Sequence, residues 1–178
     1  MNIAGFYDES ISNGLGWRAV LFVSGCPHGC VGCQNKIAQD YKYGEEFTQE
    51  KEKEILNKIK EISILKGITI SGGEPLCKEN VGEVLKFIKN VKQEKPNFIV
   101  WCYTGYTFEE LKNRKDEETD KCLNELDVLV DGKFEIEKKI PNLKFKGSTN
   151  QRIIDVQESL KEHQLIQLKF GDEERYES

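Results

Sequence analysis

No apolar run in this sequence approaches the roughly 18 residues that a membrane-spanning helix needs, so we expect no such helix. The N-terminus also lacks the basic start and the long apolar stretch of an export signal, so we expect a cytoplasmic protein. Thiols stay reduced in the cytosol and are available to bind metal ions there.

The sequence has no excess of basic residues, and histidine is scarce. The 26 Lys and Arg residues are outnumbered by 31 Asp and Glu residues; the formal net charge is −5, and no global positive field favours nucleic acid. Only two histidines occur, and neither His28 nor His163 lies in a catalytic context; we expect His28 to be an exposed loop residue. One local basic patch has two interpretations, a solvated loop or a docking surface for an acidic partner; it contains Lys138, Lys139, Lys144 and Lys146.

Internal repeats and low-complexity linkers are absent too. A chain of 178 residues suits one domain with a sizeable core, which we assign to residues 1–178, with an acidic tail that frays from about residue 171. Short apolar runs alternate along it with helical patterns. Strands are predicted near residues 17–23, 68–70, 98–103, 128–130 and 153–156.

Helices are predicted between these strands. One begins after Thr48, whose side chain caps it, and ends at Gly67; a second covers residues 81–91 and ends before Pro96; weaker helical material covers residues 107–126. This alternation predicts βαβ units and a mostly parallel sheet. The units are too few for a closed eight-stranded barrel. The sequence therefore favours an α/β fold, an open, partial β/α barrel of about five mostly parallel strands.

Three closely spaced cysteines are the most informative feature that is present. Cys26, Cys30 and Cys33 follow the pattern C-x3-C-x2-C, and no fourth cysteine comes close behind. Three thiolates can hold three corners of a [4Fe-4S] cubane and leave the fourth iron open to a ligand. A proline and two glycines lie between the cysteines, so the segment is predicted to be a tight loop. It follows the first predicted strand, at the edge where α/β folds place their active sites.

Other interpretations of the cysteines are open at this point. A zinc loop would need a fourth Cys or His ligand. The remaining cysteines lie among apolar neighbours, where buried free thiols are common, yet any of them is a candidate fourth ligand: Cys77, Cys102 and Cys122. No pairing pattern is visible, so a disulfide framework is not expected.

Polar turns that contain glycine follow the other predicted strands. The stretch Ser71-Gly72-Gly73-Glu74-Pro75 comes after the second strand; its adjacent glycines let a ligand approach the backbone, and Glu74 is a candidate acceptor for a ligand amine. Alone, such a turn is equally a strand-to-helix connection. The next two strands end in Tyr103-Thr104-Gly105-Tyr106 and Asp131-Gly132-Lys133-Phe134. One edge of the sheet is thus predicted to carry all candidate ligand contacts.

These motifs together resemble a known family. The cysteine spacing and the Gly72-Gly73-Glu74-Pro75 turn resemble the radical S-adenosylmethionine (SAM) enzymes. More closely, the chain resembles the activating proteins of anaerobic (class III) ribonucleoside-triphosphate reductases. The matching stretches follow the family's order from about Asn13 to Arg152 and cover residues 13–18, 21–26, 103–106, 130–134 and 147–152. One departure from the broad superfamily is Gly32, where many members carry an aromatic residue near the adenine; the residue that packs the adenine here is not identified.

The resemblance implies a radical SAM fold and mechanism. The three cysteines would hold a [4Fe-4S] cluster whose open iron chelates the methionine part of SAM, and one-electron reduction would give methionine and a 5′-deoxyadenosyl radical. That radical would take hydrogen from a backbone glycine of the reductase large subunit and leave a glycyl radical there, without an acid–base pair. A flavodoxin-like electron donor is expected from the family.

The same resemblance implies the residues that bind the cofactor. The first set is Gly32, Cys33, Gln34, Gly72, Gly73 and Glu74. A second set, for which a capping or turn role is equally open, is Asn13, Asp131, Asn150 and Arg152.

Two alternatives to this function are carried forward. In the first, the protein is also an enzyme, but it activates another glycyl-radical enzyme of the pyruvate formate-lyase type or uses SAM on a small molecule. From a different class, it would be a non-catalytic module with zinc or a fully ligated cluster. The turn at Gly72 and Gly73 argues against the module, because a purely structural metal site does not need it.

Overall fold

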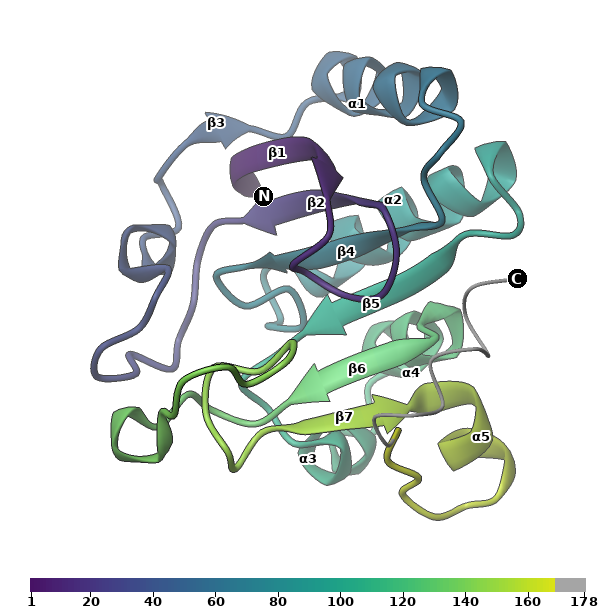
Figure 1. The fold of residues 1–178 in the computed structure, drawn as a ribbon. Helices are drawn as coiled ribbons and strands as arrows, with labels where there is room; N and C mark the ends of the chain where they lie inside the picture. The colour runs from purple at the N-terminus through teal and green to yellow at the C-terminus, as the bar shows by residue number, and fades with distance from the viewer. Residues whose placement is uncertain (169–178) are drawn as a thin grey trace.

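The computed structural model describes residues 1–168, which form one seven-stranded mixed sheet with helices packed against it (Figure 1). The predicted frayed tail lies outside the described residues. The strands are β1 Asn2–Ser10, β2 Arg18–Val23, β3 Glu45–Glu46, β4 Gly67–Gly72, β5 Ile99–Tyr103, β6 Val128–Asp131 and β7 Arg152–Asp155. Within the described part, no helix is both long and apolar enough to cross a membrane.

The sheet has a parallel centre and antiparallel margins. Its order is β3-β1-β2-β4-β5-β6-β7; β2, β4, β5 and β6 run parallel, while β1, β3 and β7 are antiparallel to their neighbours. A strand lies at each of the five predicted positions. Strands β1 and β3 were not predicted. The assignment of this sheet to a radical SAM partial barrel stays a prediction.

The helices begin and end largely where local sequence signals place them. They are α1 Gln49–Glu61, α2 Val81–Glu94, α3 Phe108–Asn113, α4 Glu117–Glu125 and α5 Val156–Lys161, with short 3-10 turns η1 Lys36–Gln39 and η2 Ile136–Lys138. As predicted, the Thr48 hydroxyl caps α1 and accepts a hydrogen bond from Lys51 N at 3.2 Å. The predicted end of this helix at Gly67 was wrong. The helix ends at Glu61, and Gly67 begins β4, where a side chain would collide with the Ile99 carbonyl.

Helices pack on one face of the sheet, and loops pack on the other. Alternate strand residues such as Leu21, Ile70 and Leu129 point into the main core, which α1, α2 and α4 cover. On the opposite face, Trp101 and Val130 form a smaller cluster with Phe145, which lies in the long connection after η2. In Figure 1 the N-terminal loop after β1 crosses in front of this second face, while α2 and α4 lie behind the sheet. Among residues 1–168, the larger core thus lies under the helices and the smaller one under the loops.

Arg18 forms the floor of that second face. Its guanidinium donates to Thr69 Oγ1 at 2.8 Å and to the Ile99 carbonyl at 2.6 Å, and it lies over the ring of Trp101. Only 1% of the residue is exposed, and burial lowers the pKa of Arg18 to about 10. Because β2, β4 and β5 all contribute to this contact, Arg18 ties together the three strands whose carboxyl ends carry the site.

Candidate functional site

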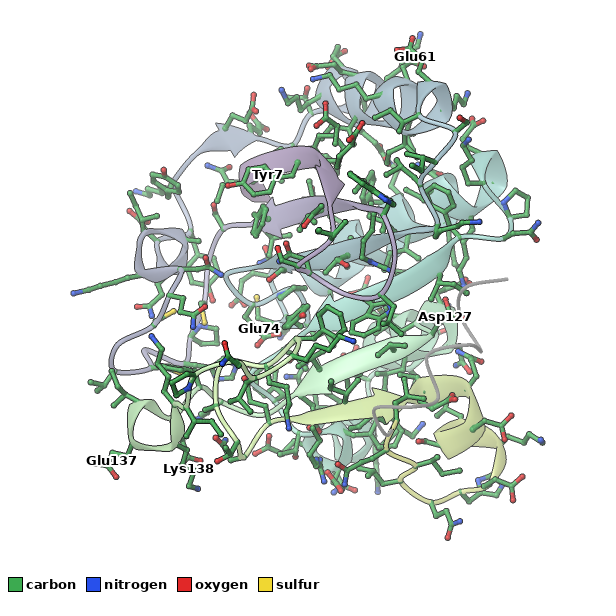
Figure 2. All side chains as sticks on the ribbon, in the orientation of Figure 1. Tyr7, Glu61, Glu74, Asp127, Glu137 and Lys138 are labelled. Atoms are coloured by element: carbon green, nitrogen blue, oxygen red, sulfur yellow. The ribbon has the colours of Figure 1, made fainter. Side chains whose placement is uncertain are left out.

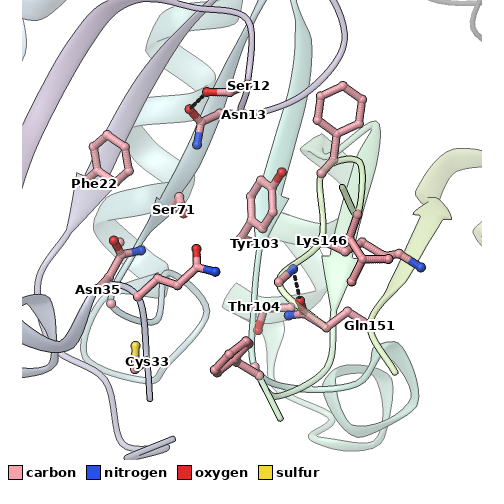
Figure 3. A pocket seen from close by; sticks show the side chains of 18 residues that line it. Ser12, Asn13, Phe22, Cys33, Asn35, Ser71, Tyr103, Thr104, Lys146 and Gln151 are labelled. Atoms are coloured by element: carbon pink, nitrogen blue, oxygen red, sulfur yellow. Dashed lines mark hydrogen bonds between the residues drawn. The ribbon is translucent and has the colours of Figure 1, made fainter. Parts of the chain in front are cut away.

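A cavity of about 320 Å³ opens at the carboxyl ends of the parallel strands (Figure 3). Its floor is a row of side chains on the loop-covered face, Phe22 from β2, Ser71 from β4 and Tyr103 from β5. Its walls come from loops, with Cys33 and Asn35 on one side and Gln151 on the other. Residues from the turns after β2, β4 and β5 thus line one cavity, among them Cys33, Gly72 and Thr104.

The cysteine loop is anchored by its backbone rather than by regular structure. Gly25 N donates to the Ala38 carbonyl at 2.8 Å and Cys26 N donates to the Gln39 carbonyl at 3.1 Å, so the loop begins and ends against η1. Gly29 and Gly32 have φ values of +61° and +71°, which glycine adopts without strain. The three thiols of the loop are half-buried, and Cys33 lines the cavity.

The donor set fits a cubane better than a single ion. Among residues 1–168, no three His, Cys, Asp or Glu side chains lie close enough to hold one metal ion. A cubane does not require that convergence, because each cysteine binds a different iron. Burial raises the pKa of Cys26; a backbone hydrogen bond from His28 lowers it, and the charges of Glu74, Cys30 and Cys33 raise it further. Bound iron would offset this cost by holding the thiolates deprotonated.

The other cysteines do not line the cavity. Cys77, Cys102 and Cys122 are buried free thiols, and Cys102 and Cys122 belong to the main core under the helices. Burial raises the pKa of Cys77 to about 11 and that of Cys122 to about 12, and the pKa of Cys102 also lies well above its ordinary value. Thiols that stay protonated are poor metal ligands. The cavity therefore receives thiols from the loop alone.

The double glycine lets two backbones meet. Gly72 has a φ of +102°, and a Cβ there would lie 2.4 Å from the Val23 carbonyl oxygen. A Cβ on Gly73 would lie 2.4 Å from the carbonyl oxygen of Gly25, at the root of the cysteine loop. Gly73 N donates to Val23 O at 2.7 Å. The turn thus packs directly against the cysteine loop, and both glycines line the same cavity as Cys33.

Comparison with known proteins agrees with this geometry. A model of the family described as "4Fe-4S single cluster domain" matches residues 12–154. A relative from Pasteurella multocida (strain Pm70), named "Anaerobic ribonucleoside-triphosphate reductase-activating protein", is 44% identical over 86% of this chain and 96% of its own length. The chain belongs to this family. Relatives with the same name come from Escherichia coli (strain K12), 40% identical over 85% of this chain and 96% of theirs, and from Enterobacteria phage T4, 37% identical over 86% and 93%.

The glutamate of the double-glycine turn, Glu74, makes hydrogen bonds to several protein groups. Figure 2 labels Glu74 near the carboxyl ends of the strands, and the residue is only 1% exposed. Both carboxylate oxygens are already engaged, by two backbone N–H groups and two side chains. These contacts fix the carboxylate among protein groups, and its contact with a ligand amine stays a prediction.

The prediction for His28 was wrong. We predicted an exposed loop residue, yet its side chain is 5% exposed and its Nε2 lies 2.7 Å from Glu74 Oε2. The prediction failed because no local pattern relates a loop histidine to a carboxylate that lies 46 positions away.

The structure gives a reason for glycine at position 32, which the sequence alone did not. A Cβ at Gly32 would lie 2.2 Å from Cδ1 of Ile136, which belongs to η2. The isoleucine thus occupies the space beside the third cysteine into which a side chain at position 32 would extend. Gly32 does not line the cavity, whereas its neighbours Cys33 and Gln34 do.

The second set of predicted residues is divided between two places. Asn13 lines the cavity, and its Oδ1 accepts a hydrogen bond from Ser10 Oγ at 2.8 Å. Asp131, Asn150 and Arg152 do not; they line a neighbouring hollow of about 370 Å³ at the end of β6. Asp131 is fully buried and accepts from Arg152 Nε at 2.9 Å. Asp131 and Arg152 thus form an ion pair at this hollow, and their contact with a ligand stays a prediction.

Replacing Arg152 with alanine is expected to destabilise the fold by about 2–4 kcal/mol, because the buried carboxylate of Asp131 would lose its ion-pair partner and keep only the hydrogen bond from Phe108 N. Chemical denaturation would measure the loss. The double variant with Asp131→Asn should recover part of the stability, since the unpaired charge is then removed. A single variant as stable as the parent protein would contradict the assigned role.

Several cavity residues escaped sequence reasoning. Phe22 and Tyr103 were assigned to strands, and the alternation of strand residues would have placed them on the loop-covered face. Gln151 was named only within a family stretch. Its side chain accepts from Gly147 N at 2.7 Å and donates to the Gly132 carbonyl at 2.8 Å, so it shapes the loop that forms one cavity wall. No spacing rule identifies such a residue.

Proposed function

We propose that this protein is a radical SAM activating enzyme, which uses a [4Fe-4S] cluster held by Cys26, Cys30 and Cys33 to generate a glycyl radical on the large subunit of an anaerobic ribonucleotide reductase. One observation carries the proposal: Cys33 and the turn at Gly72 and Gly73 line a single cavity. When bound together, the cluster and SAM supply the reductive cleavage that yields the hydrogen-abstracting radical.

The chain's own residues position and shield the reactants. The three thiolates would hold three irons of the cluster, which would leave the fourth iron free to bind a ligand. Gly72 and Gly73 line the cavity where a ligand's methionine end would lie, and because neither carries a side chain the turn can pack directly against the cysteine loop. Phe22 and Tyr103 supply apolar walls that exclude water from a reactive species. A cavity of about 320 Å³ falls in the size range of small-molecule sites.

Support for the partner comes from the relatives' names and from the open edge of the sheet. The large reductase subunit would present its glycine at this edge, and a flavodoxin-like protein would supply the electron in the cytoplasm. The fold we propose is the open barrel of radical SAM enzymes, in which the parallel strands β2, β4, β5 and β6 line the cofactor.

Anaerobic incubation with SAM, a reductant and the cognate reductase tests the function. Electron paramagnetic resonance (EPR) should show the doublet of a glycyl radical on the reductase, and omission of SAM should abolish it. A pyruvate formate-lyase is the matched control substrate and should stay unmodified. A doublet on the control but not on the reductase would assign the protein to the other activase class, and no SAM-dependent signal on either would refute activation.

The basic patch offers a second test, of docking. Lys138 ends η2 and Lys139 follows it, and both are exposed. Ile136 of η2 packs on the cysteine loop, whereas Lys146 lines the cavity and is left unchanged. Reversing both charges, with Lys138→Glu and Lys139→Glu, should raise the reductase concentration needed for half-maximal activation roughly tenfold at low salt. SAM cleavage without the reductase should not change.

The matched control reverses two exposed lysines on α1, with Lys53→Glu and Lys60→Glu. Helix α1 lies at the far end of the molecule from η2 (Figure 1), so the control changes net charge equally without touching the site. Equal weakening by both double variants would show a general charge effect, and no weakening by the η2 variant would remove this patch from the docking surface.

A further inference from the structure

Glu74 is a buried junction of three chain segments. Its Oε1 accepts from Leu76 N at 2.9 Å and from Thr104 Oγ1 at 2.7 Å. Its Oε2 accepts from Gly105 N at 2.7 Å and lies 2.7 Å from His28 Nε2. Because hydrogen bonds to an ionised carboxylate are roughly twice as strong as neutral ones, this carboxylate holds the turn after β5 firmly.

His28 brings the cysteine loop to that junction. It lies between the first two cysteines of the loop, and its Nε2 donates to a carboxylate that acts as acceptor for its other partners. The imidazole also packs on Gly105, where an added Cβ would lie 2.4 Å from His28 Cδ2. Gly105 lines the cavity. One side chain therefore connects the metal-binding loop with the cavity wall formed after β5.

Tyr106 and Arg114 stack next to His28. The ring of His28 meets the edge of Tyr106 with 4.4 Å between ring centroids, and Arg114 lies over the same tyrosine at 3.8 Å. Arg114 in turn donates to the Leu76 carbonyl at 2.5 Å. Leu76 also donates its backbone N–H to Glu74, the partner of His28. The contacts therefore form a closed ring that includes the histidine. A ring of this kind fixes the orientation of the imidazole more tightly than one hydrogen bond would.

We propose that His28 is a positioning residue, which acts through Glu74 to hold the cysteine loop in register with the cavity wall at Gly72 and Gly105. The inference rests on the proposed function, since the register matters only when a ligand bridges the cluster and the wall. His28 contributes no iron ligand through Nε2, because Glu74 occupies that nitrogen. Removing a contact that lies one step behind the metal ligands commonly lowers metal affinity or activity 10- to 100-fold.

Three variants test the role: His28→Ala, His28→Gln and Glu74→Gln. The matched control is His163→Ala, because His163 is exposed and lies at the end of α5, outside the site. Each protein is reconstituted with iron and sulfide under anaerobic conditions and reduced. Iron content and the EPR spectrum of the reduced cluster are then measured during titration with SAM, without any reductase.

We expect all four proteins to retain iron, because the three cysteines are untouched. The SAM concentration for the half-maximal spectral change should rise roughly 10- to 100-fold for His28→Ala and Glu74→Gln. His28→Gln should recover part of this loss, since its amide can donate the same hydrogen bond, and the control should titrate like the parent protein.

Three results would overturn the inference. They are a parental SAM titration in His28→Ala, equal impairment of His28→Ala and His28→Gln, and loss of iron from all three site variants, which would assign His28 to cluster assembly. A different result would be a parent protein that contains iron but whose EPR spectrum does not change with SAM. That result would overturn the proposed function and this inference with it.

Discussion

Replacing Cys30 with alanine is expected to abolish both iron binding and SAM cleavage. Cys30 supplies one of three thiolates, and the described residues offer no substitute at the cavity, since the remaining cysteines are buried elsewhere. The loop has no regular structure of its own; its first residues are hydrogen-bonded to η1, and His28 contacts Glu74. Iron should fall from about four atoms per reconstituted chain to near zero. Iron and sulfide analysis, with chromatography of 5′-deoxyadenosine, measures both effects.

The control for this change is Cys102→Ala, which also removes one thiol. Cys102 is fully buried in the main core, so the variant should lose about 1 kcal/mol of stability and keep its iron and its cleavage activity. Full iron content and cleavage in the Cys30 variant would contradict the assignment of the cluster to this loop. Loss of iron from the Cys102 variant would point to a ligand outside the loop.

A methyl group on Gly73 is expected to separate the turn from the cysteine loop. In Gly73→Ala the new Cβ would meet the carbonyl oxygens of Gly25 at 2.4 Å and Ala38 at 2.7 Å. Both atoms belong to backbone, so neither can move aside as a side chain would. A displacement of about 1 Å between catalytic groups can cost 100-fold in rate, and we expect SAM cleavage to fall roughly 100-fold.

Gly5→Ala is the matched glycine control. Gly5 lies in β1, and an added Cβ there meets no atom within 4 Å. Its cleavage rate, measured under the same anaerobic conditions, should equal that of the parent protein. If Gly73→Ala also cleaved SAM at the parental rate, the close packing of turn and loop would have no functional role.

Much of the framework was predictable because it follows from local patterns. The central strands appear as apolar runs, since they are buried on both faces, as in the fully buried Ala19 to Leu21 of β2. Parallel strands then bring their following turns to one edge, which places Cys33 near Gly72 without knowledge of any contact. Strand β1 was missed for the opposite reason. Only Ile3 is buried in it, so its sequence carries no apolar run.

The missed parts of the site are contacts between distant loops. His28 meets Glu74 over 46 positions, and Ile136 covers Gly32 from η2. Neither pair has a period or spacing that a sequence displays, because each depends on where the folded strands deliver the loops. Arg152 and Asp131 were identified as notable residues for the same family stretches, yet only the structure shows that they bind each other. Residue type indicated importance, and packing decided the role.

The most direct test of the central claim uses the reduced protein with SAM and no partner. Chromatography of the anaerobic mixture should show methionine and 5′-deoxyadenosine in equal amounts, with formation that stops when the cluster is oxidised. A protein with a full complement of iron, a reduced cluster and SAM recovered intact would contradict the claim that Cys26, Cys30 and Cys33 leave one iron open for this chemistry.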